Sequence, residues 1–348
     1  MKLHKKIIIF ILVVFFKTET VFSENNLFNV NNIQLEKKDK LSNNALANDA
    51  IKKGFNQLIK KILLKEDINK LSDLSLPAIK QLVTYYQITN VSDEDKKEEL
   101  VNFSVTFDKE KLHNLFYKRE ILYSEISDKE IYILPIFIKE GEIFIFNNNY
   151  FYKSWNDNYK NDLIEFILPL ENIEIIQNIN TYKDNLINLD VNKLFEEYSN
   201  KNLAFILIED GKVSNKIYIK TVIQGKKVSK SFDVKKKKLL NEKFYENITS
   251  EIQKELIDLV KSKNLIDVRT PSFLNVKLDT NRKSNLVELK SRIENIDSIE
   301  NIYVQEFNKD YMNLRIKYLG KLEKIISLLR TKKIDLKLIN EKWIIRTL

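Results

Sequence analysis

Two spacings of apolar residues alternate along the chain, and together they limit the fold class. From residue 101 to residue 107 every second residue is apolar, which is the pattern of a strand with one buried face. Between residues 47 and 62 the apolar side chains recur every three or four positions, which places them on one side of a helix. Both patterns occur in each of three successive segments. The sequence therefore predicts a multi-domain α+β protein with small antiparallel or mixed sheets and packed helices.

We expect three domains: an N-terminal α+β domain at residues 24–126, a central α/β domain at 127–263 and a C-terminal domain at 264–348. The C-terminal domain is the most regular. Its predicted elements follow the order β-α-β-β-α-β, at residues 273–278, 286–296, 302–307, 312–318, 322–329 and 334–339. This is the order of a ferredoxin-like unit, and residues 343–345 predict a short additional strand. Because such units host many unrelated activities, the pattern predicts shape and not function.

The central domain opens with a nearly continuous apolar run at residues 131–138, which predicts a strand. Pro135 lies inside this run and predicts that the strand is at a sheet edge or carries a bulge, because proline donates no ladder hydrogen bond. A helix with apolar residues on one face closes the domain at residues 244–259.

The first 23 residues have the layout of a secretory signal peptide. Lysines at positions 2, 5 and 6 precede the apolar stretch 7–16, and a Val21-x-Ser23 element follows it. This stretch is about half the length of about 20 residues that a membrane-spanning helix needs. We therefore favour cleavage after Ser23 over a retained anchor. The expectation is a periplasmic protein with no membrane span once the signal is removed.

The chain contains no cysteine, which excludes disulfides, thiolate metal sites, thiol nucleophiles and a lipid-bearing cysteine. An exported chain of this size is then held together by its cores, which favours a bacterial periplasmic protein. The formal net charge is +9 and falls to +6 without the signal segment. Lysines and acids are interspersed, and the one run of cations is residues 235–238. This pattern does not predict a nucleic-acid partner.

The residue types needed for common catalytic sites are scarce. His113 is the only histidine after residue 23, and the five glycines are too far apart for a phosphate-binding loop. We therefore expect no metal and no cofactor. Carboxylates remain as an alternative, because a pair of them suffices for a hydrolase. The candidates in the aromatic-rich region are Asp157, Asp162, Glu171 and Glu174.

The most unusual local feature is an aromatic stretch flanked by asparagines at residues 147–155. Aromatic rings supply apolar area and amides supply directional hydrogen bonds, a combination that suits sugars or peptides. The alternative is that the rings pack against the side of the sheet while the asparagines satisfy turns. The predicted binding residues are Asn149, Tyr150, Phe151, Tyr152 and Trp155.

Taken in order, five segments resemble a proteobacterial envelope family called domain of unknown function 2066. They lie at residues 47–63, 101–107, 132–138, 149–155 and 196–211. The family has an Asn-Pro-Trp-x-x-Ala-Trp element at the fourth segment. Asn149 and Trp155 fit it, whereas Tyr150, Phe151 and Ser154 replace the proline, the first tryptophan and the alanine. The resemblance implies an exported protein and brings no catalytic residues.

The preferred interpretation is a soluble, non-enzymatic periplasmic protein that binds a protein partner in cell-envelope assembly or maintenance. Exposed sheet edges of small α+β units are the expected means of contact. One alternative is a glycan-binding or peptidoglycan-binding protein that uses the aromatic stretch. The other is a carboxylate-dependent hydrolase.

Overall fold

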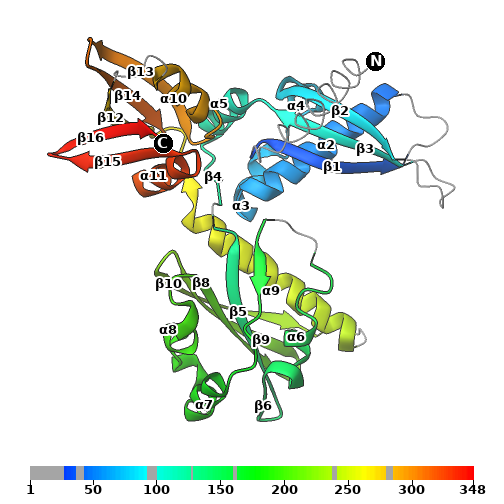
Figure 1. The fold of residues 1–348 in the computed structure, drawn as a ribbon. Coiled ribbons are helices and arrows are strands. Elements are labelled where there is room, and N and C mark those ends of the chain that lie inside the picture. The colour runs from blue at the N-terminus through cyan, green and yellow to red at the C-terminus, as the bar shows by residue number, and fades with distance from the viewer. Residues whose placement is uncertain are drawn as a thin grey trace, which may run out of the picture. The chain divides into compact units, whose positions relative to one another are not determined.

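The computed structural model describes residues 27–36, 43–91, 100–126, 128–159, 163–236, 241–279 and 285–348, and the predicted signal peptide lies outside these ranges. The protein is α+β, with helices packed on small antiparallel or mixed sheets, as predicted (Figure 1). The chain forms two compact units. One combines residues up to 123 with residues 266–348, and the other contains residues 124–265. Each unit is described by itself.

The first unit begins with a three-stranded antiparallel sheet in the order β1 (Asn29–Glu36), β3 (Leu100–Phe107), β2 (Val83–Val91). Helix α2 (Asn43–Ile62) covers one face of this sheet. The predicted alternation of β3 is confirmed, since Val101, Phe103, Val105 and Phe107 are all buried. Gly54 allows α2 to approach closely, because a Cβ there would lie 2.8 Å from Cδ1 of Ile33.

Short helical elements lie before β2 and after β3. They are α3 (Lys65–Ile68), the 3-10 turn η1 (Asn69–Leu71), α4 (Leu76–Gln81) and α5 (Lys109–Arg119). Asp108 caps α5, because its side chain accepts a hydrogen bond from the Lys111 amide at 3.1 Å. Strand β4 (Tyr123–Ser124) follows α5.

The C-terminal part of this unit is a five-stranded sheet in the order β13-β14-β12-β16-β15. Helices α10 (Asn285–Ile293) and α11 (Leu322–Thr331) pack on one face of it. The strands are β12 (Ser272–Asp279), β13 (Ile299–Phe307), β14 (Tyr311–Tyr318), β15 (Ile334–Ile339) and β16 (Lys342–Thr347). Terminal strand β16 pairs in parallel with β12 and separates β15 from it. The elements thus follow the predicted order, but the sheet has five strands because the chain's last strand takes the place beside the first.

The second unit is a mixed sheet in the order β10-β9-β8-β5-β6, and β7 also pairs with β5. Its strands are β5 (Glu130–Lys139), β6 (Glu142–Phe144), β7 (Glu165–Ile167), β8 (Asn202–Asp210), β9 (Ser214–Ile223) and β10 (Lys226–Lys235). Gln224 and Gly225, both with positive φ angles, form the hairpin turn between β9 and β10.

Both faces of this sheet are covered. Helices α6 (Tyr150–Lys153) and α9 (Asn241–Lys263) share a core with one face. Helices α7 (Ile173–Thr181) and α8 (Val191–Leu194) share a core with the other face. The remaining elements are the 3-10 turns η2 (Phe146–Asn148), η3 (Leu186–Asn188) and η4 (Glu196–Tyr198), and the strand β11 (Leu265–Ile266) at the end of the unit.

The position of Pro135 corrects one expectation. Strand β5 lies inside the sheet and pairs with β8 from Ile131 to Ile138. On its other side, β7 pairs with residues 130–132 and β6 with residues 137–139. Pro135 therefore lies in the gap between two short partners, where no strand needs its missing N–H group.

Within the ranges that the structure describes, no helix has the length and apolar character needed to span a bilayer.

Candidate functional site

The aromatic stretch predicted as a binding surface lies mostly in the core of the second unit. Asn149, Phe151 and Trp155 are buried, with at most 1% of each residue exposed. Tyr150 and Tyr152 are half-buried. Phe151 and Trp155 belong to the core beneath α9, which also receives Phe244 and Ile248.

Hydrogen bonds explain why these residues are ordered there. The Asn149 amide donates to the Pro135 carbonyl at 2.8 Å, and its side-chain oxygen accepts from the Phe151 N–H at 2.9 Å. The Tyr152 hydroxyl donates to the Pro169 carbonyl at 2.7 Å. Burial, followed by the nearby Glu171 carboxylate, raises the pKa of Tyr152. Asn149 thus fastens α6 to β5, and the buried rings provide packing and not a platform for a sugar.

The predicted carboxylates do not form a shared cleft in the described chain. Asp157, Glu171 and Glu174 are exposed, and Asp162 lies outside the described residues. Glu171 accepts a long hydrogen bond of 3.4 Å from the Asn147 amide. Glu174 follows the cap of α7, where the Asn172 side chain accepts a hydrogen bond from its N–H at 2.7 Å. Exposure leaves these acids without the desolvation that tunes a catalytic carboxyl.

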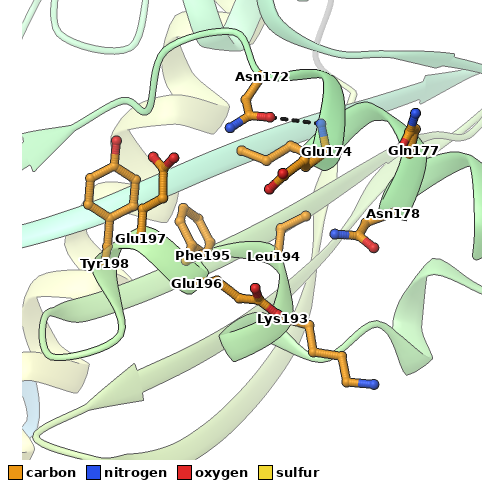
Figure 2. A pocket seen from close by; sticks show the side chains of 11 residues that line it. Asn172, Glu174, Gln177, Asn178, Lys193, Leu194, Phe195, Glu196, Glu197 and Tyr198 are labelled. Atoms are coloured by element: carbon orange, nitrogen blue, oxygen red, sulfur yellow. Dashed lines mark hydrogen bonds between the residues drawn. The ribbon is translucent and has the colours of Figure 1, made fainter.

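A groove of about 290 Å³ lies between α7, α8 and η4 (Figure 2). Its floor is apolar, formed by the buried side chains of Ile175, Leu194 and Phe195. Its rim is polar. Figure 2 shows the Glu174 and Asn178 side chains directed over the floor, while the Lys193 ammonium points away. The other rim residues are Asn172, Gln177, Glu196, Glu197 and Tyr198.

The groove has the amides and carboxylates that bind polar, hydroxyl-bearing or cationic groups. One wall is rigid, because the Tyr198 ring stacks on Tyr132 with centroids 4.4 Å apart. No group of His, Asp and Glu side chains in the described chain is arranged to hold a metal ion. The groove is an open polar depression with no second feature that points to a particular ligand.

His113 is distant in sequence from the groove residues, and its surroundings are those of a packed core side chain. It is buried in α5, and its Nδ1 lies 3.4 Å from Oε1 of Glu300. Its ring packs against Phe28 and Tyr123 with centroids 5.7 and 5.3 Å away. His113 thereby joins the N-terminal and C-terminal parts of the first unit.

Strand β2 is the feature of this molecule that suits a binding function best. It is an edge strand with a register shift between Val83 and Tyr85, and from Tyr85 to Val91 it pairs with β3 without interruption. Its sequence, VTYYQITNV, contains no Lys, Arg, Asp, Glu, Pro or Gly. Tyr85, Tyr86 and Ile88 are 50%, 43% and 48% exposed. A regular, uncharged and apolar edge is a template for pairing with another strand.

The other edge strands longer than three residues in the described chain are blunted. Strand β1 has a register shift between Val30 and Ile33, and Asn32 there has a φ of 58°. Strand β13 has two register shifts and two glutamates, and β15 carries an aspartate and a lysine. Strand β10 carries four lysines. Charges of this kind prevent edge pairing, and among the described edge strands of this length β2 is the one that carries no charged residue.

The sequence interpretation did not single out β2 as a site. The available signal was a run of nine residues with β-forming side chains and no charge, followed by a strongly charged connection at residues 92–98. What the sequence did not show is which of the strands lies at the edge of its sheet.

Neither the chain nor its fold matches a protein-family model, a curated protein or a solved structure.

Proposed function

We propose that the protein is exported to the periplasm and acts there, without catalysis, by binding a protein partner in cell-envelope assembly or maintenance. The observation that carries this proposal is strand β2, the uncharged and regularly paired edge of the N-terminal sheet. Such an edge binds an extended segment through main-chain hydrogen bonds, and pockets beside alternate side chains provide selectivity.

The side chains of β2 suggest what the partner segment looks like. Tyr86 and Ile88 lie opposite the buried Val105 and Phe103 of β3, so they point to the side that α2 covers. Both are nevertheless about half exposed. An added strand would cover them if its own apolar residues alternate, because cross-strand neighbours on one face pack together. The partner segment is therefore extended, with apolar residues at every second position.

Three further features support the proposal. The layout of residues 1–23 predicts export. The buried aromatic stretch and the exposed carboxylates Asp157, Glu171 and Glu174 offer little to a catalytic or glycan-binding alternative. We interpret the C-terminal sheet as a ferredoxin-like unit enlarged by one strand, a shape compatible with an interaction protein.

Site-specific crosslinking in intact cells tests the proposal. A photo-crosslinking residue in place of Tyr85 should repeatedly capture one envelope protein, and mass spectrometry should place the crosslink in an extended segment of it. Hydrogen exchange of the purified pair should slow at β2 amides, because these would gain hydrogen-bonded partners.

The matched variants are Ile88→Lys on β2 and Ser231→Lys on β10. A lysine on β2 introduces the charge that protects natural edges, so Ile88→Lys should abolish the crosslink. Ser231 is exposed on an edge that already carries lysines, so its replacement should leave the crosslink intact. No recurring partner at Tyr85, or equal loss of the crosslink in both variants, would contradict the proposal.

A further inference from the structure

The groove between α7, α8 and η4 carries negative charge from two of its walls. Glu174 belongs to α7, whereas Glu196 and Glu197 belong to η4, and all three line the groove. Their side chains are exposed, and none of the three carboxylates forms an ion pair within the described chain. Because like charges that share a depression repel one another, a cation that enters it is bound favourably.

One described cation lines the groove, and its charge is directed elsewhere. The Lys193 ammonium points away from the floor (Figure 2). A hydrogen bond from the Asn192 N–H, and to a lesser extent the charge of Lys193, lower the pKa of the Asp190 carboxyl, so Lys193 acts on that carboxyl. Lys201, which is close in sequence, does not line the groove and pairs with Glu130 at 2.7 Å. The three glutamates of the groove therefore keep their charge.

The segment that forms the groove is acidic in a chain that is basic as a whole. Residues 170–201 contain six acidic residues and three lysines, a net charge of −3, whereas the whole chain has a net charge of +9. The third of these lysines, Lys183, does not line the groove. A local excess of one sign raises the concentration of ligands of the opposite sign. The groove is thus complementary to a cationic ligand.

Two large apolar side chains are exposed at the start of α7, next to the groove. Leu170 is 82% exposed and Ile173 is 72% exposed. Ile173 lies one turn before Gln177, which lines the groove, so the two residues are neighbours on one side of the helix. Exposed apolar surface with a polar rim is typical of protein-interaction sites. This observation is independent of the acidic residues and adds an apolar contact beside them.

The shape of the groove favours a segment of a larger partner over a free small molecule. Sites for small molecules bury about 70–90% of the ligand surface, whereas this groove is open above its floor. Each exposed ion pair contributes little by itself, so a partner must combine several of them with the apolar contact at Ile173. Arginine suits the lining best, because its planar guanidinium has five donors for carboxylate and amide oxygens.

We propose that this groove binds a basic segment of a partner protein, with arginine side chains among Glu174, Glu196 and Glu197 and an apolar residue of the segment on Ile173. The inference rests on the proposed function only in taking the ligand to be a protein segment. The groove belongs to the second unit, whereas β2 belongs to the first.

The test measures fluorescence anisotropy of a labelled peptide, two arginines and one leucine between glycine-serine flanks, with the purified chain. The positive charge of the whole chain disfavours this peptide, so binding reports a local site. Binding should occur at low salt and weaken steeply at about 0.5 M salt, where the screening length is a few ångström. Glu174→Gln combined with Glu197→Gln should weaken it about fivefold, because two exposed charge-assisted pairs are lost. Ile173→Ser removes the apolar contact and should weaken it about threefold.

The matched control is Glu142→Gln combined with Glu246→Gln, two exposed glutamates of the second unit that do not line the groove. This pair removes the same charge and should leave affinity unchanged. Free arginine is the competing ligand and should bind far more weakly than the peptide. No peptide binding, equal weakening in both double variants, or free arginine binding as tightly as the peptide would each overturn the proposal. Ile88→Lys should not alter peptide affinity, so failure here is distinct from failure at β2.

Discussion

The central sheet of the second unit and the C-terminal sheet of the first unit differ in how many of their faces are covered. Strand β8 is buried along seven consecutive residues, because helices pack on both faces of its sheet. Strand β12 largely alternates between buried and more exposed residues, because the helices that the structure describes pack on one face of its sheet. A sheet covered twice contributes mainly stability. A sheet covered once has a free face, and the N-terminal sheet adds a free edge.

The largest expected effect comes from Trp155, on the covered side of this comparison. Trp155→Ala should lower the free energy of unfolding by about 3–5 kcal/mol, because it empties a large volume in a packed core. Tyr303→Ala on the open face of the C-terminal sheet should change it by about 0.5 kcal/mol or less. Urea denaturation followed by circular dichroism measures both. Similar losses of unfolding free energy in the two variants would contradict the view that the covered sheet faces contribute more to stability than the open one.

Asn149 should produce the next largest effect. Its buried amide makes two hydrogen bonds that join α6 to β5, and Asn149→Ala leaves the Pro135 carbonyl and the Phe151 N–H without partners. The expected loss is about 2–3 kcal/mol. Asn275→Ala is the control, because Asn275 is exposed on the open face. A loss below that of the control would mean that Asn149 has no role in the core.

The difference between the sheets was readable in part from the sequence. The continuous apolar run of β5 and the strict alternation of β3 predicted buried and half-buried strands correctly, because each pattern reports the number of covered faces. Pro135 misled the sequence interpretation, because a one-dimensional pattern does not show that β5 has two short partners with a gap between them. The parallel insertion of β16 beside β12 is likewise a long-range pairing that no local signal specifies.

The candidate sites were harder to predict than the fold. Asn and aromatic residues at 149–155 have the composition of a binding loop, yet Phe151 and Trp155 are buried. Composition does not distinguish a ring that stacks on a ligand from one that fills a core. The site proposed at β2 depends on long-range strand pairing, because only the order of strands in the sheet shows that β2 lies at an edge.

A third prediction concerns the first unit and acid. A hydrogen bond from His113, followed by contact with the Lys317 ammonium, lowers the pKa of Glu300 from its usual value to about 2. Because the pKa is lower in the folded protein than in the unfolded chain, this carboxylate stabilises the fold above about pH 4.5. Its contribution, about 1–2 kcal/mol for a partly exposed group, is lost as the pH falls toward 2.

Glu300→Gln should therefore destabilise the protein at pH 7 and much less at pH 3, measured as urea midpoints at the two pH values. Glu323→Gln, at an exposed position of α11, is the control and should show no such difference. An equal effect of Glu300→Gln at both pH values would show that the charge of this residue is not what matters.

The smallest expected effect on stability is at β2. It compares an edge position with a central position of the same sheet. Ile88 is 48% exposed on the edge strand and lies directly opposite Phe103 of β3, which is buried. Ile88→Lys should change the free energy of unfolding by about 0.5 kcal/mol or less, because the lysine stem can lie on the surface while its ammonium stays in water. Phe103→Lys should prevent folding, because it places a charge in the core beneath α2. A large loss for Ile88→Lys would mean that the β2 edge is covered by part of the protein itself, and β2 would then not be free to bind a partner.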